Sequence, residues 1–179
     1  MEDPLKEYKE KRRFGKTPEP TGGKSSGKNI FVVQKHDASR LHYDFRLEID
    51  GVLKSWAVPK GPSLNPKDKR LAVMTEDHPL DYADFEGVIP DGLYGAGPVI
   101  VWDTGVVDGE LEAGLRKGHM SFTLHGKKLK GEWSLVQLKG GKNWLLIKKD
   151  DGFASDRDIL AEMPDSVLSG RSIQDVLKP

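Results

Sequence analysis

Apolar and polar side chains alternate one for one between residues 41 and 49. The odd positions carry the apolar residues Leu41, Tyr43, Phe45, Leu47 and Ile49. The even positions carry the polar residues His42, Asp44, Arg46 and Glu48. Because a period of two residues is typical of a strand with one buried and one exposed face, the sequence predicts a strand whose exposed face presents His42, Asp44 and Arg46.

The dipeptide Asp50-Gly51, which ends this strand, is a strong signal for a hairpin with a two-residue turn. With these two residues as the loop, the returning strand places Ser55 opposite Arg46 and Ala57 opposite Asp44. Because both partners are small, we expect a shallow depression around the two charged side chains, open to a ligand.

Further short runs of β-branched and aromatic residues predict more strands. They cover residues 30–34, 52–58, 70–75, 99–102, 120–124, 131–137 and 143–148. Turn signals lie at residues 103–105, 125–126 and 140–141. Many short strands separated by turns are typical of an antiparallel sheet that closes on itself. The predicted fold is therefore mainly β, a single-domain antiparallel β-barrel with a few short flanking helices.

Helices are a minor part of the prediction. Residues 4–13 have the pattern of a short amphipathic helix, and residues 111–117 form a second candidate. A last helix is expected after Ser172, because Asp175 follows three residues later and can complete a capping box.

A segment rich in Pro, Gly and Ser, residues 15–29, predicts an arm or loop. It contains Gly22-Gly-Lys-Ser, but the first Gly of a phosphate-binding loop is missing and no helical run follows. We therefore expect an N-terminal helix and arm over residues 1–29 and a barrel over residues 30–179, one domain overall.

The composition limits the kinds of site that the chain can build. Its 179 residues include no cysteine, so a metal must be held by imidazole and oxygen, and a reducing cytosol suits the chain. No apolar run has the length of a membrane span, and the first residues lack the apolar core of a signal peptide. We expect a cytoplasmic protein with no membrane partner.

Charge does not by itself indicate a partner. The 28 basic and 28 acidic residues cancel, so the molecule as a whole does not attract nucleic acid. Basic residues cluster between Lys9 and Lys16 and again at Lys127, Lys128 and Lys130. Such runs are usually solvated, and a phosphate-contacting role stays open on the sequence alone.

The most informative residues fall within nine positions, at His36, His42 and Asp44. Two imidazoles and one carboxylate that leave other positions open are a working composition for a metal site. Arg46, on the same predicted face, is suited to a phosphate oxygen. We therefore predict a metal site that acts on a phosphate.

Two further stretches leave their roles open. His78 can contact a phosphate or act as a general acid, with Tyr82 orienting it, or it can be a satisfied loop histidine. The run from Phe85 to Gly97 is rich in Gly and aromatic residues, for which a structural role is favoured. All four tryptophans lie in predicted strands, where packing in the core is expected: Trp56, Trp102, Trp133 and Trp144.

Several motifs together resemble the 3'-phosphoesterase domain of the bacterial and archaeal DNA ligase D system. They are the runs Val33–Leu47, Trp56–Pro62, Glu76–Pro79, Phe85–Pro90 and Tyr94–Gly97, followed by Leu124–Gly131 and Asn143–Lys148. The resemblance extends from about Tyr8 to Val176. It implies a Mn²⁺-dependent enzyme of non-homologous end joining, with Co²⁺ or Zn²⁺ as possible substitutes. Such enzymes remove a 3'-terminal ribonucleoside from a primer strand and then hydrolyse the remaining 3'-phosphate to a 3'-hydroxyl.

The resemblance also implies partners and site residues. The substrate is primer-template DNA, the partners are the Ku, ligase and polymerase modules of end joining, and the location is the nucleoid. The implied metal ligands are His36, His42 and Asp44, and the implied catalytic residues are Arg46, His78 and Tyr82. The implied substrate-binding residues are Gln34, Lys60, Arg70, Glu76, Arg12 and Glu19. Arg13 and Leu93 depart from the family pattern, in which an acid is expected at both positions.

Two other functions remain open on the residues alone. A non-haem Fe(II) oxygenase would use His42-x-Asp44 together with His125, but it would leave His36 and His78 without a role. A non-catalytic nucleic-acid-binding repair module is disfavoured by the zero net charge.

Overall fold

The computed structural model describes residues 3–22 and 29–178. The strands are β1 Ile30–Asp37, β2 Leu41–Ile49, β3 Val52–Val58, β4 Arg70–Met74, β5 Gly87–Ile89, β6 Gly97–Gly109, β7 His119–Gly126, β8 Lys130–Gln137 and β9 Asn143–Lys148. The helices are α1 Lys6–Glu10, α2 Leu111–Lys117, α3 Ile159–Glu162 and α4 Ile173–Leu177, with a 3₁₀ turn η1 at Leu80–Asp84.

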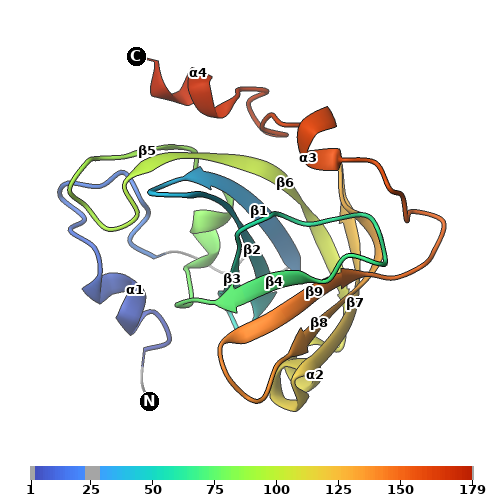
Figure 1. Ribbon diagram of the computed structural model, residues 1–179. Coiled ribbons are helices and arrows are strands. Elements are labelled where there is room, and N and C mark those ends of the chain that lie inside the picture. The colour runs from blue at the N-terminus through green and yellow to red at the C-terminus, as the bar shows by residue number, and fades with distance from the viewer. Residues whose placement is uncertain (1–2, 23–28, 179) are drawn as a thin grey trace.

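Eight antiparallel strands close into a barrel in the order β1-β2-β3-β4-β9-β8-β7-β6 (Figure 1). The ring closes because β1 pairs with β2 on one edge and with β6 on the other. The short strand β5 pairs with the first residues of β6, outside this ring. The predicted mainly β barrel with few short helices is therefore confirmed.

The β2–β3 hairpin has the predicted register. Arg46 lies opposite Ser55, and Asp44 lies opposite Ala57. The turn residues Asp50 and Gly51 have φ of 54° and 78°, the left-handed conformation that a tight two-residue hairpin requires at both positions. The turn therefore fixes which residues of β2 face inward and which face outward.

The barrel interior is a packed aromatic core. From β2, Tyr43, Phe45 and Leu47 point inward. They share this core with all four tryptophans, which are buried as predicted: Trp56, Trp102, Trp133 and Trp144. Leu111 of α2 and Ile159 of α3 join the same core, and Figure 1 shows these two helices at opposite ends of the barrel. The even-numbered residues of β2 are left for the outer wall.

A second apolar cluster lies against the outer wall and is covered by the N-terminal segment. Tyr8 of α1 and Tyr82 of η1 pack with Val32 of β1 and Leu53 of β3. The rings of Tyr8 and Tyr82 meet edge to face with centroids 5.9 Å apart. Residues 3–22 are thus fixed over the part of the wall that carries the polar face of β2.

The turn predicted at residues 103–105 is wrong, because these residues lie inside β6. The turn predicted at residues 125–126 begins at the end of β7, where Gly126 N donates to the carbonyl of Leu129 before β8 starts. Strands β6 and β7 approach each other too closely for a side chain, since a Cβ at Gly105 would lie 2.1 Å from the carbonyl oxygen of His125. The glycine therefore marks a close contact between strands and not a turn.

The helices form where they were predicted, but not all of them have the predicted length. The first helix is shorter than the predicted 4–13, whereas α2 has the predicted bounds. Ser172 and Asp175 form the predicted capping box at α4. Residues 23–28 of the predicted arm lie outside the described part of the chain.

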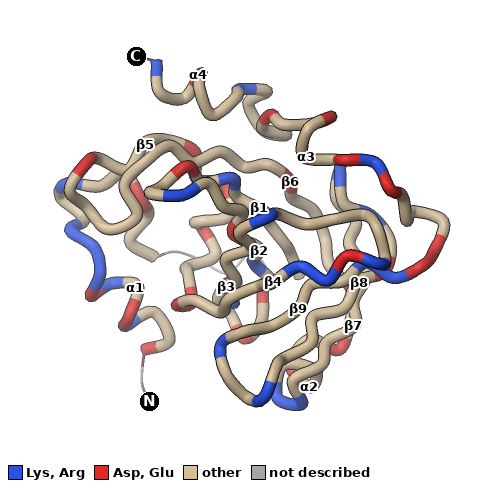
Figure 2. The backbone as a smooth tube through the Cα atoms, in the orientation of Figure 1, with Lys and Arg blue, Asp and Glu red and all other residues tan. Residues whose placement is uncertain are grey.

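Basic and acidic stretches are interleaved along the backbone (Figure 2), as the zero net charge of the chain suggests. In the described part of the chain, no helix has both the length and the apolar character needed to cross a membrane.

Candidate metal centre

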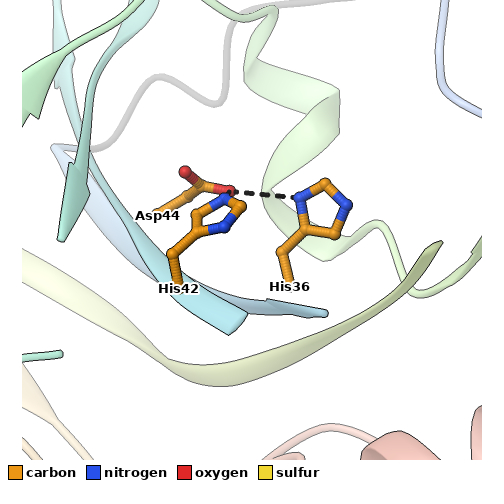
Figure 3. Close-up of side chains that lie close together, drawn as sticks. All are labelled: His36, His42 and Asp44. Carbon is orange, nitrogen blue, oxygen red and sulfur yellow. Dashed lines mark hydrogen bonds and ion pairs between the residues drawn. The ribbon is translucent and has the colours of Figure 1, made fainter. Parts of the chain in front are cut away.

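The three predicted metal ligands converge on the outer wall of the barrel. His36 of β1 pairs across the strands with His42 of β2, and Asp44 follows on the same face. Asp44 Oδ2 lies 3.2 Å from His42 Nε2 and 3.6 Å from His36 Nδ1. Figure 3 shows the carboxylate of Asp44 turned toward both imidazole rings. One donor atom from each residue lies within 4.8 Å of the others.

Backbone carbonyls determine which imidazole nitrogens face this centre. His36 Nε2 donates to the carbonyl of Gly95 at 2.6 Å, and His42 Nδ1 donates to the carbonyl of Arg40 at 3.0 Å. Because a carbonyl only accepts, each imidazole is left with its other nitrogen, Nδ1 of His36 and Nε2 of His42, facing Asp44. A proton on either nitrogen forms a hydrogen bond to the carboxylate, and a cation that replaces the proton takes the lone pair. Metal bonds of about 2.1 Å place neighbouring donor atoms about 3 Å apart, which the two distances from Asp44 approach. A small inward turn of the imidazoles therefore brings all three donors within reach of one divalent cation.

Nearby charges keep the carboxylate ready to bind a cation. Asp44 is buried, which opposes its ionisation, yet the charge of Arg46 and hydrogen bonds from both imidazoles hold its pKa well below the ordinary value. Burial likewise opposes the charged form of His42, but the hydrogen bond and charge of Asp44 outweigh it and raise the pKa of His42. Protons and a cation therefore compete for His42.

Arg46 is held rigidly beside the three ligands. Its Nε donates to Gln34 Oε1 at 2.7 Å, and its Nη2 lies 3.5 Å from Asp44 Oδ2. Gln34 in turn donates to the carbonyls of Tyr82 and Phe85 at 2.8 Å and 3.1 Å. A buried glutamine thus fixes the guanidinium so that its charge is directed at the centre.

His78 lies between two guanidinium groups. Its Nδ1 donates to the carbonyl of Glu76 at 3.0 Å, and its Nε2 faces Arg12 Nη2 at 3.3 Å. Arg46 Nη1 approaches Nδ1 at 3.2 Å. Burial together with the charges of Arg46 and Arg12 holds the pKa of His78 well below its ordinary value, so the imidazole is neutral.

The N-terminal segment contributes a buried ion pair to the same cavity. Arg12 Nε donates to Glu19 Oε2 at 2.9 Å, and Tyr82 Oη donates to the same oxygen at 2.7 Å. Arg12 also packs over the ring of Tyr8, 3.9 Å from its centroid. Burial and the charge of Glu19 raise the pKa of Tyr82 well above its ordinary value, which keeps the phenol protonated.

These groups line one cavity of about 330 Å³. Most of the predicted site residues line it: Arg12, Glu19, His36, His42, Asp44, Arg46, Glu76, His78 and Tyr82. Gln34 lies behind Arg46. Lys60 and Arg70 instead line a separate cavity of about 320 Å³ together with Asp68 and Asp156.

Two residues of this site were not singled out from the sequence. Tyr94 lines the cavity, and Gly95 supplies the carbonyl that fixes His36. Their signals were the run of glycines and aromatic residues between Phe85 and Gly97 and the motif Tyr94–Gly97, which carries part of the resemblance without a role for either residue.

His125, the third ligand of the oxygenase alternative, takes no part in this centre. It lies on β7, where its Nε2 meets Asp108 Oδ2 at 2.7 Å. The metal-binding cluster found among the described residues uses His36 as its third ligand. The arrangement that an oxygenase would need is therefore not formed.

Comparisons with known proteins identify relatives of this chain. The family model of the DNA Ligase D 3'-phosphoesterase domain matches residues 34–137. A multifunctional non-homologous end joining protein LigD from Pseudomonas aeruginosa is 61% identical over 183 residues, which cover 95% of this chain and 22% of that protein.

Two relatives with lower identity are also much longer than this chain. A multifunctional non-homologous end joining DNA repair protein LigD from Mycobacterium tuberculosis is 49% identical over 90% of this chain and 22% of its own length. A LigD protein from Mycolicibacterium smegmatis is 44% identical over 83% of this chain and 21% of its own length. The chain thus spans about a fifth of the length of these relatives.

Proposed function

The chain belongs to the DNA ligase D 3'-phosphoesterase domain family, and on this basis we propose that it is a metal-dependent enzyme that clears blocked 3' ends of DNA in end joining. It removes a 3'-terminal ribonucleoside from a primer strand and leaves a 3'-phosphate. It then hydrolyses that phosphate to a 3'-hydroxyl. The observation that carries the proposal is that His36, His42 and Asp44 share one cavity with the guanidinium groups of Arg46 and Arg12.

The proposed cofactor is Mn²⁺, held by His36, His42 and Asp44, with Co²⁺ or Zn²⁺ as substitutes. Support comes from the donor set, which contains no sulfur and presents an ionised carboxylate and two imidazole nitrogens that the backbone carbonyls leave available. When bound, the cation supplies Lewis-acid polarisation of a phosphate oxygen.

The protein's own residues bind and orient the phosphate. Arg46 and Arg12 pair with its oxygens and stabilise the additional charge of the transition state. His78, being neutral with its proton on Nδ1, accepts from Arg12 Nη2 at Nε2 and so orients that guanidinium toward the phosphate without adding charge. Tyr82 acts as a positioning residue, because its hydroxyl donates to Glu19 and its ring lies 5.0 Å from the guanidinium carbon of Arg46.

The same proposal covers the substrate, the partner modules and the residues around the main cavity. The substrate is a primer-template end in the cytoplasm at the nucleoid, where the Ku, ligase and polymerase modules act on the same break. Lys60 and Arg70, outside the main cavity, contact the DNA farther from the reacting phosphate. Residues 3–22 act as part of one domain with the barrel, since Arg12 and Glu19 complete the cavity.

The test is cleavage of a 5'-labelled primer that ends in one ribonucleotide and is annealed to a template, with Mn²⁺, Co²⁺, Zn²⁺ or a chelator. We expect a 3'-phosphate product followed by a 3'-hydroxyl product. His42→Ala should abolish both steps, whereas His125→Ala, at an exposed histidine outside the cavity, should retain them. If the wild type with Mn²⁺ leaves both ends intact, or if His42→Ala matches it, the proposal is wrong.

A further inference from the structure

An exposed aromatic ring stands beside the metal centre. Tyr94, in the loop between β5 and β6, is 49% exposed. It directly precedes Gly95, whose carbonyl accepts the hydrogen bond of His36. Gly92 and Gly95 have φ of +84° and +72°, so the loop turns tightly on either side of the ring. The backbone that orients a metal ligand therefore also fixes the position of Tyr94.

Tyr94 lies where two cavities meet. It lines the main cavity of about 330 Å³ and a neighbouring cavity of about 150 Å³. Arg12 and Glu19 are also common to both, while Arg13 and Leu93 line the smaller one. A ligand whose phosphate lies at the metal centre can therefore extend past Tyr94 into the second cavity.

Two cations lie over this ring, and part of the residue remains exposed. Lys11 Nζ lies 4.8 Å from the ring centroid and 3.4 Å from the hydroxyl, and the guanidinium carbon of Arg12 lies 5.4 Å from the centroid. About half of the residue still faces solvent. Because an exposed aromatic face among basic groups is suited to a nucleic-acid base, the chemistry of this surface is that of a stacking platform.

From this arrangement we propose that Tyr94 and the smaller cavity form a nucleobase subsite, in which the base of the 3'-terminal nucleoside stacks on the Tyr94 ring. The proposal rests on the function proposed above. The stacked base leaves with the ribonucleoside in the first step, and a 3'-phosphate end has no base at that position. The platform therefore serves ribonucleoside removal far more than phosphate removal.

The two steps allow a selective kinetic test. Tyr94→Leu should lower the rate of ribonucleoside removal about tenfold more than the rate of 3'-phosphate release, because one stacked base is lost. Tyr94→Phe, which keeps the ring, should restore the wild-type ratio of the two rates. Phe153→Leu removes an exposed aromatic ring elsewhere on the surface and is the matched control, with no change in the ratio.

Binding gives a second measurement that does not depend on turnover. A primer carrying 2-aminopurine as its 3'-terminal ribonucleoside base should lose fluorescence when wild-type protein binds it in the presence of a chelator. The loss should persist in Tyr94→Phe and disappear in Tyr94→Leu. Unchanged fluorescence with saturating wild-type protein contradicts the subsite even if a variant fails to fold.

The outcomes separate the two proposals. If the wild type cleaves neither substrate, the proposed function fails. If it cleaves both, and Tyr94→Leu slows the two steps equally or slows neither, the function stands and the nucleobase subsite is wrong.

Discussion

The imidazole of His36 donates from Nε2 to the carbonyl of Gly95 at 2.6 Å, and this bond turns Nδ1 toward Asp44. The partner is a backbone group, so no side-chain substitution removes it directly. A residue with a Cβ at position 95 nevertheless disturbs it, because the φ of +72° strains any L residue and the Cβ would lie 3.4 Å from His36 Cε1.

We therefore expect Gly95→Ala to weaken Mn²⁺ binding about tenfold, as measured by electron paramagnetic resonance of the free ion. Gly92→Ala is the matched control, since its φ of +84° is equally strained but its Cβ would have no neighbour within 4 Å. If both variants lose the same affinity for Mn²⁺, the effect is due to loop strain and not to the carbonyl of Gly95.

Arg46 should be irreplaceable by lysine. Its guanidinium spans Gln34, His78 and Asp44 at once, which a single ammonium cannot do. We expect Arg46→Ala to lower kcat for 3'-phosphate release about a hundredfold, and Arg46→Lys to recover little of it. Manganese binding, titrated in parallel, should fall much less than kcat. Wild-type kcat in either variant would show that Arg46 does not act on the phosphate.

Tyr82 should support the site without exchanging a proton. Its buried phenol donates to Glu19, and its pKa lies well above the ordinary value. Tyr82→Phe should therefore change the magnitude of kcat while leaving the shape of the pH-rate profile unchanged. A shift of the alkaline limb in this variant would instead identify the phenol as a general acid.

His78 should make folding stability fall in mild acid. Its pKa in the folded protein lies below the value of about 6.5 in the unfolded chain, so above that pH neither state is protonated and the group contributes nothing. Below it the unfolded chain binds a proton that the buried imidazole does not, and stability falls by about 1 kcal/mol between pH 7.5 and pH 5.5.

Urea unfolding of the metal-free protein at both pH values measures this effect. His42 acts in the opposite direction, because its pKa is raised in the folded protein, so the comparison with His78→Gln is the informative quantity. The variant should lose less stability on acidification than the wild type. An equal loss would show that His78 is not the group responsible.

The N-terminal segment should be required for activity and not only for DNA affinity. Removing residues 1–28 also removes Arg12 and Glu19 from the cavity, so we expect catalysis to be lost. Lys16→Gln keeps the ion pair and should only reduce the dependence of DNA binding on salt, by about one unit of slope if it contacts a phosphate. An active truncated protein would contradict this role.

The clustering of His36, His42 and Asp44 could be predicted from the sequence because the signal was local. The alternation along β2 and the turn at Asp50 and Gly51 fix the register, and the register puts Asp44 and Arg46 on one face. His36 joins them through pairing with the adjacent strand. A short stretch of chain was therefore enough to predict that these three side chains lie together.

The rest of the cavity depends on contacts that no local pattern encodes. Glu19 meets Tyr82 across 63 residues, and Arg12 meets His78 across 66, so Arg12 and Glu19 came only from the family resemblance. Lys60, implied by the same resemblance, lines a different cavity. Gly105 was predicted to lie in a turn, but it allows two strands to approach closely. Gly95 was not singled out, although its carbonyl orients His36.

The inner and outer faces of β2 have separate tasks. Tyr43, Phe45 and Leu47 pack in the barrel core, while Asp44 and Arg46, which lie between them in the sequence, line the cavity of the candidate site. Alternate residues of this one strand thus serve the packing of the core and the candidate site. The aromatic interior can therefore be redesigned for heat resistance while the side chains that line the cavity are left unchanged. In evolution, too, stability and the chemistry of the cavity can vary independently.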